Sequence, residues 1–516
     1  MDIPEKCTVL VVGGGPAGAY AACVLAREGI DTVVIEADHM PRYHIGESML
    51  PSFRHYLKFI ELDSAFDNFG FTKKVGAAFK MNPKNREGFT DFLAVGGPNN
   101  YSWNVIRSQA DELIFRHAAK CGAKTFEGVK VNSVNFDQPA SNGDAKGADS
   151  VGKPVSAVWT RKADGTTGTI KFDYIVDASG RVGLLNTKYL KDRHYNKSLK
   201  NVANWAYYKG AGLYGEGTKR ANVPFFEALR DESGWAWFIP LHDGTHSIGV
   251  VMEQEISNKK KREAANLEKY FDEALEQVPM LRGFLGDAKK CTEVKSASDY
   301  SYHSSTYAFQ NARIIGDAGC FIDPFFSSGV HLAVTGGLSA GTTIAASIRG
   351  DIDEATAGRW HTNKIREGYA RFCLVVLSAY KQMRNQGDPV LADFNEDNFD
   401  KAFSFFKPII QGTADAGTSK LTQAEFSKTI DFLTKAFNPA INTQFKDANQ
   451  EIVGEEPQPQ AAAAQGLSPE DLEALQSIRI HHGKHTMGMD SFTTDVIDGL
   501  IPRLETGRLT LVAADA

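Results

Sequence analysis

Several residues in this sequence have types and spacings that are suited to chemistry. Residues 13–18 read Gly-Gly-Gly-Pro-Ala-Gly, and residues 327–329 read Ser-Ser-Gly. Two indoles stand two positions apart, at Trp235 and Trp237, and the amine of Lys74 follows a second lysine. Glycine-rich turns and helix starts present N–H groups to phosphates and other anions, whereas indoles can wall a pocket and an amine can hold a small ligand. The elements around these residues decide which of these roles each can take.

The first forty residues predict a β-α-β unit. Residues 8–12, Thr-Val-Leu-Val-Val, form a short apolar run that is typical of a strand buried on both faces of a parallel sheet. The turn at 13–18 leads into a helical pattern over 19–27, and a second strand-like run over 32–36 ends in Glu36. Strand, turn, helix and acidic strand end follow one another as in dinucleotide-binding proteins. We therefore expect this unit to bind a dinucleotide.

Each glycine of the turn has a separate expected task. Gly13 makes the tight turn, Gly15 lets the backbone approach a pyrophosphate, and Gly18 lets the helix pack on the strand. The helix start adds free N–H groups and a partial positive charge for the same pyrophosphate. The carboxylate of Glu36 is placed to accept hydrogen bonds from a ribose diol, which also argues against a 2′-phosphate there.

A second half of the same site is expected much later in the chain. Residues 312–315 form another short strand, which is followed by Gly-Asp-Ala-Gly at 316–319. A third strand ends at Asp177, and Arg107 with Asp111 opens a helix. Each of these is ambiguous alone, but together they resemble FAD domains of the glutathione-reductase and aromatic-hydroxylase type, so FAD is favoured over NAD. The predicted cofactor-binding residues are Gly13, Gly15, Ala17, Gly18, Glu36, Arg42, Arg107, Asp317 and Gly319.

The predicted fold class is α/β. We expect an FAD-binding domain over residues 1–350, interleaved with an antiparallel substrate sheet at about 200–300, in which residues 235–241 and 247–252 form a hairpin around an Asp-Gly turn. Residues 351–516 are expected to form a mainly helical C-terminal region that lines the substrate pocket. The Pro-, Gln- and Ala-rich stretch 454–466 suits a linker.

Composition excludes several classes of protein. The chain has 516 residues, and 57 basic against 63 acidic side chains give a net charge of −6, which favours neither nucleic acid nor an anionic membrane as a partner. Six scattered cysteines suggest neither a disulfide framework nor a zinc site, and fit a reducing, cytoplasmic setting. The histidines at 481, 482 and 485 are interpreted as a polar turn, with metal binding as the weaker alternative, so no metal is predicted.

Four motifs carry a resemblance to a known family. They are Ile45-Gly-Glu-Ser48, Gly70-Phe-x-x-Lys74-x-Gly-Ala-x-Phe79, Trp235-x-Trp237-x-Ile-Pro240 and Phe321-x-x-Pro324-x-x-Ser327-x-Gly329. Across most of residues 1–350 the chain resembles the flavin-dependent halogenases, in particular the fungal group that acts on phenolic polyketides. The Trp-x-Trp-x-Ile-Pro motif is the most specific, because two residues apart both indoles project from one face of a strand.

The resemblance implies a role for each motif. Reduced FAD, supplied by a separate NAD(P)H-dependent flavin reductase, would act with O2 and chloride or bromide to give a hypohalous acid. Trp235 and Trp237 would screen the organic substrate from the flavin, and the halide would bind at Ser328 and Gly329. Lys74 would be the catalytic residue that delivers hypochlorous acid; in extended chain its neighbour, Lys73, should point the other way.

One departure from the tryptophan-type relatives bears on the substrate. Those relatives carry a Pro-Leu-Glu-Ser segment whose Glu assists the lysine, whereas here residues 324–327 read Pro-Phe-Phe-Ser and place Phe326 at the matching position. Without that carboxylate, activation is expected to come from the substrate. A small phenolic or resorcylic molecule is therefore the expected substrate.

Two alternatives remain open on the residues alone. A flavin monooxygenase that hydroxylates an aromatic ring would use the same fold and cofactor. A non-catalytic FAD-binding or redox partner protein is a third possibility, against which the lysine and the small residues at 327–329 weigh.

Overall fold

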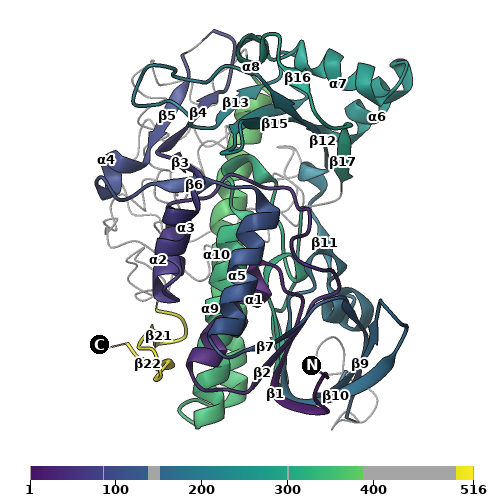
Figure 1. Ribbon diagram of the computed structural model, residues 1–516, viewed down its shortest axis with the longest axis vertical. Helices are drawn as coiled ribbons and strands as arrows, with labels where there is room; N and C mark the ends of the chain where they lie inside the picture. Colours follow the sequence, from purple (N-terminus) through teal and green to yellow (C-terminus); the bar gives the residue numbers. More distant parts are fainter. Residues whose placement is uncertain (1, 85, 138–150, 299–300, 387–495, 515–516) are drawn as a thin grey trace, which may run out of the picture.

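The computed structural model describes residues 2–84, 86–137, 151–298, 301–386 and 496–514 (Figure 1). Its first sheet has eight strands in the described chain, of which five run parallel in the order β7-β2-β1-β10-β20. The strands are β1 Lys6–Val12, β2 Thr32–Ile35, β7 Lys124–Phe126, β8 Val129–Phe136, β9 Pro154–Arg161, β10 Thr167–Asp177, β19 Ala308–Phe309 and β20 Ala312–Ile314.

The parallel strands end at one common edge. Val12 pairs with Ile35 on one side and with Asp177 on the other, and Asp177 in turn pairs with Ile314. The loops after all four strands therefore leave the sheet at the same level. In open α/β sheets, ligands bind outside this carboxyl edge.

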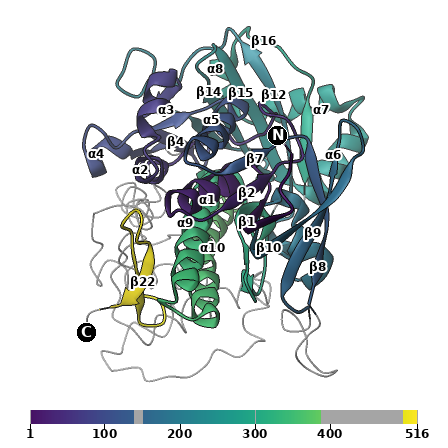
Figure 2. The same cartoon turned by 60° about the horizontal axis from the view of Figure 1, so that its bottom comes forward.

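Four long helices pack beside this sheet (Figures 1 and 2). They are α1 Pro16–Arg27, α5 Arg107–Lys120, α9 Gly329–Arg349 and α10 Glu354–Met383, and α1 contacts both α5 and α9 while α9 also contacts α10. The α9 helix is rich in small residues because its neighbours come very close: a Cβ on Gly337 would lie 2.9 Å from the carbonyl oxygen of Ala17. Among the described helices, none combines the length and apolar character required to cross a membrane.

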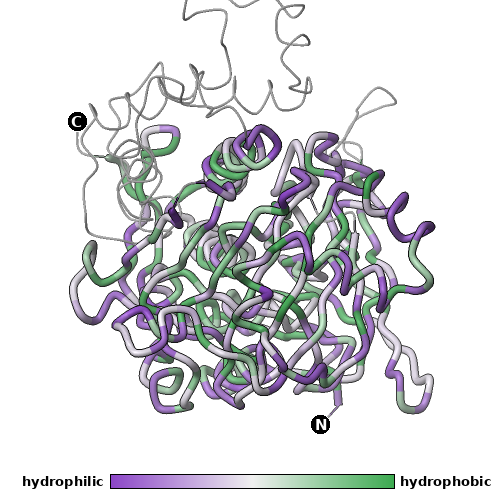
Figure 3. Tube along the Cα trace, turned by 90° about the horizontal axis from the view of Figure 1, so that it is seen from above, coloured by the Kyte–Doolittle hydropathy of each residue, from purple (hydrophilic) through white to green (hydrophobic). Residues whose placement is uncertain are grey.

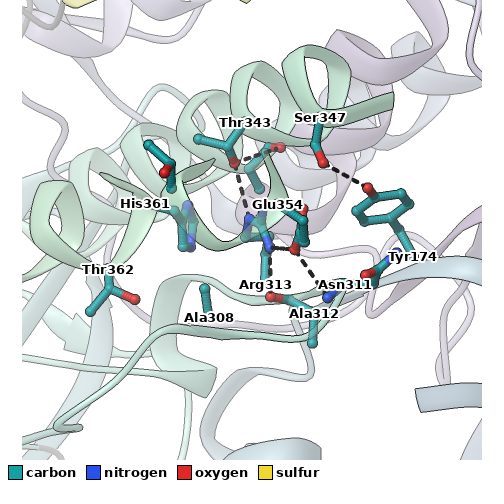
Figure 4. A network of polar contacts seen from close by, with 12 residues as sticks. Tyr174, Ala308, Asn311, Ala312, Arg313, Thr343, Ser347, Glu354, His361 and Thr362 are labelled. Carbon is teal, nitrogen blue, oxygen red and sulfur yellow. Dashed lines mark hydrogen bonds and ion pairs between the residues drawn. The ribbon is translucent and has the colours of Figure 1, made fainter. Parts of the chain in front are cut away.

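A buried polar network joins strand β20 to α9 and α10 (Figure 4). The fully buried Arg313 donates from Nε to Thr343 Oγ1 (3.0 Å) and from Nη1 to Glu354 Oε1 (2.7 Å). The same carboxylate accepts the backbone N–H of Asn311 (3.0 Å). Since Arg313 lies just before the Gly-Asp turn at 316–317, these bonds fix the strand that presents this turn.

The second sheet also has eight strands among the described residues, and lies at the far end of the molecule in Figure 1. Its strands are β4 Gly76–Lys80, β5 Gly88–Asp91, β12 Asn201–Lys209, β13 Phe225–Ala228, β14 Gly234–Pro240, β15 Thr245–Glu253, β16 Lys289–Lys290 and β17 Lys295–Ser298. The predicted hairpin is present as β14 and β15. The sheet also takes in β4 and β5 from the N-terminal part of the chain, because β4 pairs with β13 in parallel.

Short elements complete the described structure. Three short helices pack on the second sheet: α6 Gln254–Glu263, α7 Leu267–Leu275 and α8 Pro279–Leu285. Five further elements lie between the two ends of the molecule: α2 Ser52–Phe59, α3 Asp63–Phe69, α4 Phe92–Gly96, β3 Thr72–Lys74 and β6 Ser102–Asn104. The two-residue strands β11 His194–Tyr195 and β18 Tyr302–His303 pair, and so do β21 Leu500–Arg503 and β22 Thr510–Ala513 near the C-terminus. Hydrophilic segments are frequent along the rim of the molecule (Figure 3).

Two sequence predictions lie outside the described residues. They are the linker at 454–466 and the histidines at 481, 482 and 485. The predicted α/β class, with a second sheet that is antiparallel except for the β4–β13 pair and with long helices after residue 328, is confirmed.

Candidate active site

A cavity of about 530 Å³ opens at the carboxyl edge of the parallel sheet and runs to the second sheet. At one end it is lined by the glycine turn after β1 and by Glu36, and at the other by Trp235 and Trp237. Predicted site residues that line it are Gly13, Gly15, Ala17, Glu36, Arg42, Arg107, Trp235, Trp237, Asp317 and Gly329. Four others, Gly18, Lys74, Gly319 and Ser328, are not part of its lining.

The glycine turn has the geometry that its residue types predict. Gly13 has a φ of +104°, which L side chains rarely adopt. A Cβ on Gly18 would lie 2.0 Å from the carbonyl oxygen of Gly13, so only glycine permits the close approach of helix and strand. Glu36 is buried, and its carboxylate accepts the N–H groups of Gly14 (2.6 Å) and Asp38 (2.9 Å). The turn and the acidic strand end are thus hydrogen-bonded into one unit.

A buried ion-pair cluster forms the wall next to this turn. Arg107 donates from Nε and Nη2 to the two carboxylate oxygens of Asp111 (2.8 and 3.0 Å), and Arg42 Nη1 donates to the same carboxylate (3.1 Å). Burial alone would raise the pKa of Asp111, but the charge of Arg107 lowers it. Asp111 therefore stays ionised and holds both arginines at the cavity.

Asp317 occupies the cavity wall after β20. Burial raises the pKa of its carboxyl to about 6, although Arg107 and two more arginines oppose this shift. Its backbone carbonyl accepts a hydrogen bond from Tyr302 OH (2.7 Å). Asp177, at the end of β10, accepts the N–H groups of Ser179 (3.0 Å) and Leu185 (2.7 Å) and thereby shapes the neighbouring loop.

These features fit FAD. The cavity offers a glycine turn at the start of α1 for a pyrophosphate, and an acidic strand end for a ribose. A Cβ on Gly15 would lie 3.0 Å from the guanidinium of Arg42, so the bare backbone leaves room for a phosphate beside a cation. The residues that could hold the cofactor thus line one cavity.

Trp235 and Trp237 project from the same face of β14, as their spacing predicts. Their ring centroids are 5.8 Å apart, and both belong to the apolar cluster on the cavity side of the sheet. Ala236 and Phe238, which alternate with them, belong to the cluster on the other face. The cavity therefore ends at a wall of two indoles.

The indole of Trp235 is fixed by a buried polar group. Its Nε1 donates to Tyr380 OH (2.8 Å), and that hydroxyl donates to Asp323 Oδ2 (2.8 Å). Asn201 donates to the same carboxylate oxygen (2.9 Å). Burial raises the pKa of Asp323 to about 6. Helix α10 thus contributes directly to the position of the indole wall.

Lys74 is fully buried, and it ends strand β3. Its Nζ donates to Ser48 Oγ (2.8 Å) and to the carbonyl oxygen of Met49 (2.8 Å), and lies 5.1 Å from the ring centroid of Phe92. Among the described residues, no carboxylate lies within ion-pair distance, and burial lowers the pKa of the amine to about 7. Lys73 points the other way and is exposed, as strand alternation predicts.

Two serine hydroxyls connect Lys74 to the cavity. Ser48 and Ser327 both line it, and Ser327 Oγ donates to Ser48 Oγ (3.1 Å). Next along the chain, Ser328 is the N-cap of α9, and its hydroxyl is buried without a hydrogen-bond partner in the described structure. An unsatisfied buried hydroxyl at a helix start is a position where a small anion could bind.

Sequence reasoning missed part of the cavity wall. Tyr43, Glu47 and Trp205 line it as well, and are joined by hydrogen bonds: Trp205 Nε1 donates to Tyr43 OH (2.7 Å), and Tyr207 OH donates to Glu47 (2.5 Å). A signal was available, since Trp205 and Tyr207 alternate along a strand-like run. Their partners come from a loop far away in sequence, which no local pattern predicts.

Comparison with known proteins identifies the family of this chain. A model of the tryptophan halogenase family matches residues 8–101 and 90–475. The flavin-dependent halogenase ascD of Acremonium egyptiacum is 57% identical over 519 residues, which cover 100% of this chain and 94% of that protein. The sulochrin halogenase gedL of Aspergillus terreus is 49% identical over 538 residues, with 100% and 95% covered.

Solved structures agree on the fold. The myxobacterial chondrochloren halogenase CndH, an FAD-dependent halogenase, superposes with a TM-score of 0.65 at 24% identity, and the match covers 84% of this chain and 97% of that one. The cavity, the indole wall and the buried lysine therefore lie in a fold that halogenases use. On the family match and the full-length identity to its relatives, the chain belongs to the tryptophan halogenase family and is an FAD-dependent halogenase.

Proposed function

We propose that this enzyme chlorinates a small phenolic natural product, with hypochlorous acid delivered by Lys74. The observation that carries this proposal is the Lys74 amine itself: it is buried, has only neutral hydrogen-bond partners, and is joined to the cavity through Ser48 and Ser327. Bound reduced FAD would supply, with O2, the oxidising power that converts halide into hypohalous acid. A separate flavin reductase would deliver the reduced cofactor.

The cofactor would be held by the residues that surround the first part of the cavity. Gly13, Gly15 and Ala17 would bind the pyrophosphate at the start of α1, and Glu36 would bind the ribose. Gly18 would act by bringing α1 close to β1. Two of the remaining predicted residues, Arg42 and Arg107, would form the cationic wall of the cavity. The other two, Asp317 and Gly319, would form the second turn.

The halide would bind at the start of α9. The unsatisfied hydroxyl of Ser328 and the N–H groups of Ser328 and Gly329 are the donors that a chloride or bromide ion needs. Gly329 also lines the cavity, so an anion held here would be within reach of the cofactor space.

Lys74 has two ways to carry the halogen. With a pKa of about 7, a large share of the amine is neutral near neutral pH. The protonated form can hold hypochlorous acid by hydrogen bonding. The neutral form can react with it: its nitrogen bonds to chlorine, one N–H proton and the hydroxide leave as water, and a chloramine remains. Either route would bring chlorine to one position of the substrate.

The two indoles would keep the organic substrate away from the flavin. Trp235 and Trp237 are buried and in ring contact, and Trp235 is also held by Tyr380. Their bulk would exclude an arene while a small anion passes. Oxidant would then be made on one side of this wall and used on the other.

A phenolic substrate follows from what surrounds the lysine. The described residues place no carboxylate beside Lys74, so none of them supplies a base there to assist the attack on chlorine. A phenol, and more so its phenolate, is electron-rich enough to attack through the ring carbon beside the hydroxyl and then lose the ring proton. We propose further that residues 1–350 form the FAD-binding domain with its inserted sheet, and that residues 351–516 close the substrate pocket.

The test is a pair of neighbouring substitutions. Lys74→Ala should lower chlorinated product by about 10²-fold or more, while FAD binding and flavin reoxidation persist. Lys73→Ala, at the exposed neighbour, is the matched control and should retain turnover. Products are measured by mass spectrometry with reductase, chloride and a panel of small phenols. If alanine at position 74 disturbs packing, a folded Lys74→Met variant is tested for the same loss of chlorinated product. Chlorination by folded Lys74 variants at the normal rate would reject the role of the lysine.

A further inference from the structure

A cysteine pair with a neighbouring histidine lies outside the active site, where α1 and α5 pack together. Cys23 is fully buried on α1, Cys121 follows the last residue of α5, and His117 is in the last turn of α5. The two sulfur atoms are 3.0 Å apart, although the residues are separated by 98 positions. The ligand atoms of all three side chains lie within 4.8 Å of one another.

The surroundings make Cys121 the more reactive thiol. The hydrogen bond from the Cys23 thiol lowers the pKa of Cys121, and the neighbouring His117 and Arg27 lower it further against the effect of burial. The same contact, together with burial, raises the pKa of Cys23. Thiolate character and partial exposure favour the oxidation of a cysteine. Cys121 has both properties, whereas the buried Cys23 has neither, so Cys121 is expected to be oxidised first.

His117 is held in a fixed orientation beside the sulfur. Its Nε2 donates to the carbonyl oxygen of Ile60 (2.7 Å), and its interaction with Cys121 raises the pKa of the imidazole. A cationic ring next to a sulfur stabilises the thiolate. The other charged groups here are Arg27 and Glu61, which pair with each other (2.7 Å).

The sulfur separation favours redox chemistry over metal binding. Two thiolates on a tetrahedral zinc ion, with Zn–S bonds of about 2.3 Å, lie about 3.8 Å apart. The observed 3.0 Å is well below that value and close to the contact needed for one sulfur to attack the other. We propose that Cys121 and Cys23 are a peroxide-sensitive pair that closes to a reversible disulfide between α5 and α1.

The steps balance with hydrogen peroxide as the oxidant. The Cys121 thiolate attacks one peroxide oxygen, the O–O bond breaks, and hydroxide leaves and takes a proton to become water; Cys121 is now a sulfenic acid. The sulfur of Cys23 then attacks the sulfur of Cys121, and the hydroxyl leaves as water with the proton of the Cys23 thiol. Two thiols have lost two electrons, and one peroxide has become two waters.

The position of the bond gives it a structural consequence. The opposite ends of α1 and α5 carry Ala17 and Arg107, which line the cofactor cavity. A cross-link between the second half of α1 and the residue after α5 fastens these helices to each other and closes a long loop of chain. Long closed loops restrict the unfolded chain most, so the oxidised enzyme should be the more heat-resistant form.

The experiment uses the full-length enzyme with FAD bound. After reduction and removal of the reductant, hydrogen peroxide is added, free thiols are blocked with N-ethylmaleimide, and peptides are analysed by mass spectrometry. We expect a peptide pair joined through Cys23 and Cys121, a rise of a few degrees in Tm, and loss of both on adding dithiothreitol. Cys291→Ser, which removes an exposed cysteine, is the matched control and should leave both results unchanged.

Substitutions in the pair distinguish the thiol that peroxide oxidises, Cys121, from the thiol that then closes the disulfide, Cys23. In Cys23→Ser, peroxide should leave Cys121 as a sulfenic acid that dimedone traps, and no rise in Tm should occur. In Cys121→Ser, Cys23 should stay reduced. The proposal is overturned if peroxide oxidises Cys291 while Cys23 and Cys121 remain alkylatable. It is also overturned if the reduced, purified enzyme carries one zinc ion per chain that Cys23→Ser removes.

Discussion

Two buried cations in this molecule, Arg107 at the cofactor cavity and Lys74 beyond it, show how different surroundings give different chemistry. Their side chains are 6% and 1% exposed, so both have been removed from water to a similar extent. Arg107 makes two hydrogen bonds to the carboxylate of Asp111. Lys74 has only a hydroxyl and a backbone carbonyl as hydrogen-bond acceptors.

The consequence is opposite protonation behaviour. Burial alone would lower the pKa of Arg107, but the charge of Asp111 raises it, so this guanidinium is a permanent cation. Nothing opposes the effect of burial on Lys74, and its pKa falls to about 7. A permanent cation suits the binding of an anionic cofactor, whereas an amine that titrates near neutral pH suits a reaction in which it is alternately donor and nucleophile.

Buried acids in the same two regions repeat the contrast. Arg107 lowers the pKa of Asp111 in spite of burial. Asp323, behind the indole wall, accepts hydrogen bonds from the neutral side chains of Asn201 and Tyr380, and burial raises its pKa to about 6. Charge is thus compensated in the Arg107–Asp111 pair and left uncompensated at Asp323 and Lys74.

The substitution with the largest expected effect on this contrast removes the guanidinium of Arg107. Arg107→Met should lower the free energy of unfolding by about 3–5 kcal/mol, because Asp111 is left buried with one cation fewer, and FAD affinity should fall with it. Denaturant titration and flavin fluorescence measure the two effects. The double variant Arg107→Met/Asp111→Leu is the control and should recover much of the stability but not the FAD affinity. An Arg107→Met enzyme as stable as the parent would contradict the comparison.

The second test examines the lysine through pH. The pKa of Lys74 is about 7 when folded and 10.5 when unfolded, so between these values the unfolded chain binds more protons and stability rises with pH. Lys74→Met removes this contribution. From about pH 7.5 to about pH 9, the parent should gain about 2 kcal/mol relative to Lys74→Met. Urea titrations at the two pH values measure the difference.

The exposed neighbour provides the control for that measurement. Lys73→Met should change the unfolding free energy by the same amount at both pH values, because its side chain is exposed in the folded protein. If the stability difference between the parent and Lys74→Met did not change with pH, the amine would not be titrating in this interval.

Local patterns predicted the parts of the molecule that depend on neighbouring residues. The β-α-β unit follows from an apolar run and a glycine turn, and the opposite directions of Lys73 and Lys74 follow from alternation along a strand, whereas the choice of Lys74 as the inward one came from the family resemblance. The common face of Trp235 and Trp237 follows from the same alternation. In each case the side-chain direction is set by the backbone period, which the sequence contains.

Other features depend on packing between distant segments, and no local pattern contains them. The parallel pairing of β4 with β13 needs a long connection, so the sheet was expected from residues 200–300 alone. The bond from Lys74 to Ser48 depends on how the loop after β2 crosses β3. Cys23 and Cys121 have no Cys-x-x-Cys spacing, and only the packing of α1 on α5 brings them together.

The substitution with the smallest expected effect removes the hydroxyl of Ser48, which lies between Lys74 and the cavity. Ser48→Ala removes one of the two acceptors of Lys74 Nζ and the link to Ser327 Oγ, so halogenated product should form about 10-fold more slowly, as expected for the loss of one hydrogen bond to a charged group. FAD binding should not change, and the pH profile of the reaction should shift to lower pH, because the protonated amine has lost a partner. Ser102→Ala is the control: Ser102 is the strand partner of Lys74 across β3 and β6, and its buried hydroxyl donates to the carbonyl oxygen of Leu50 (2.8 Å) but accepts no hydrogen bond from Lys74 Nζ. A loss of turnover with an unshifted pH profile would mean that Ser48 supports packing only, whereas the shift would show that the protonation of Lys74 is set by its few neutral partners.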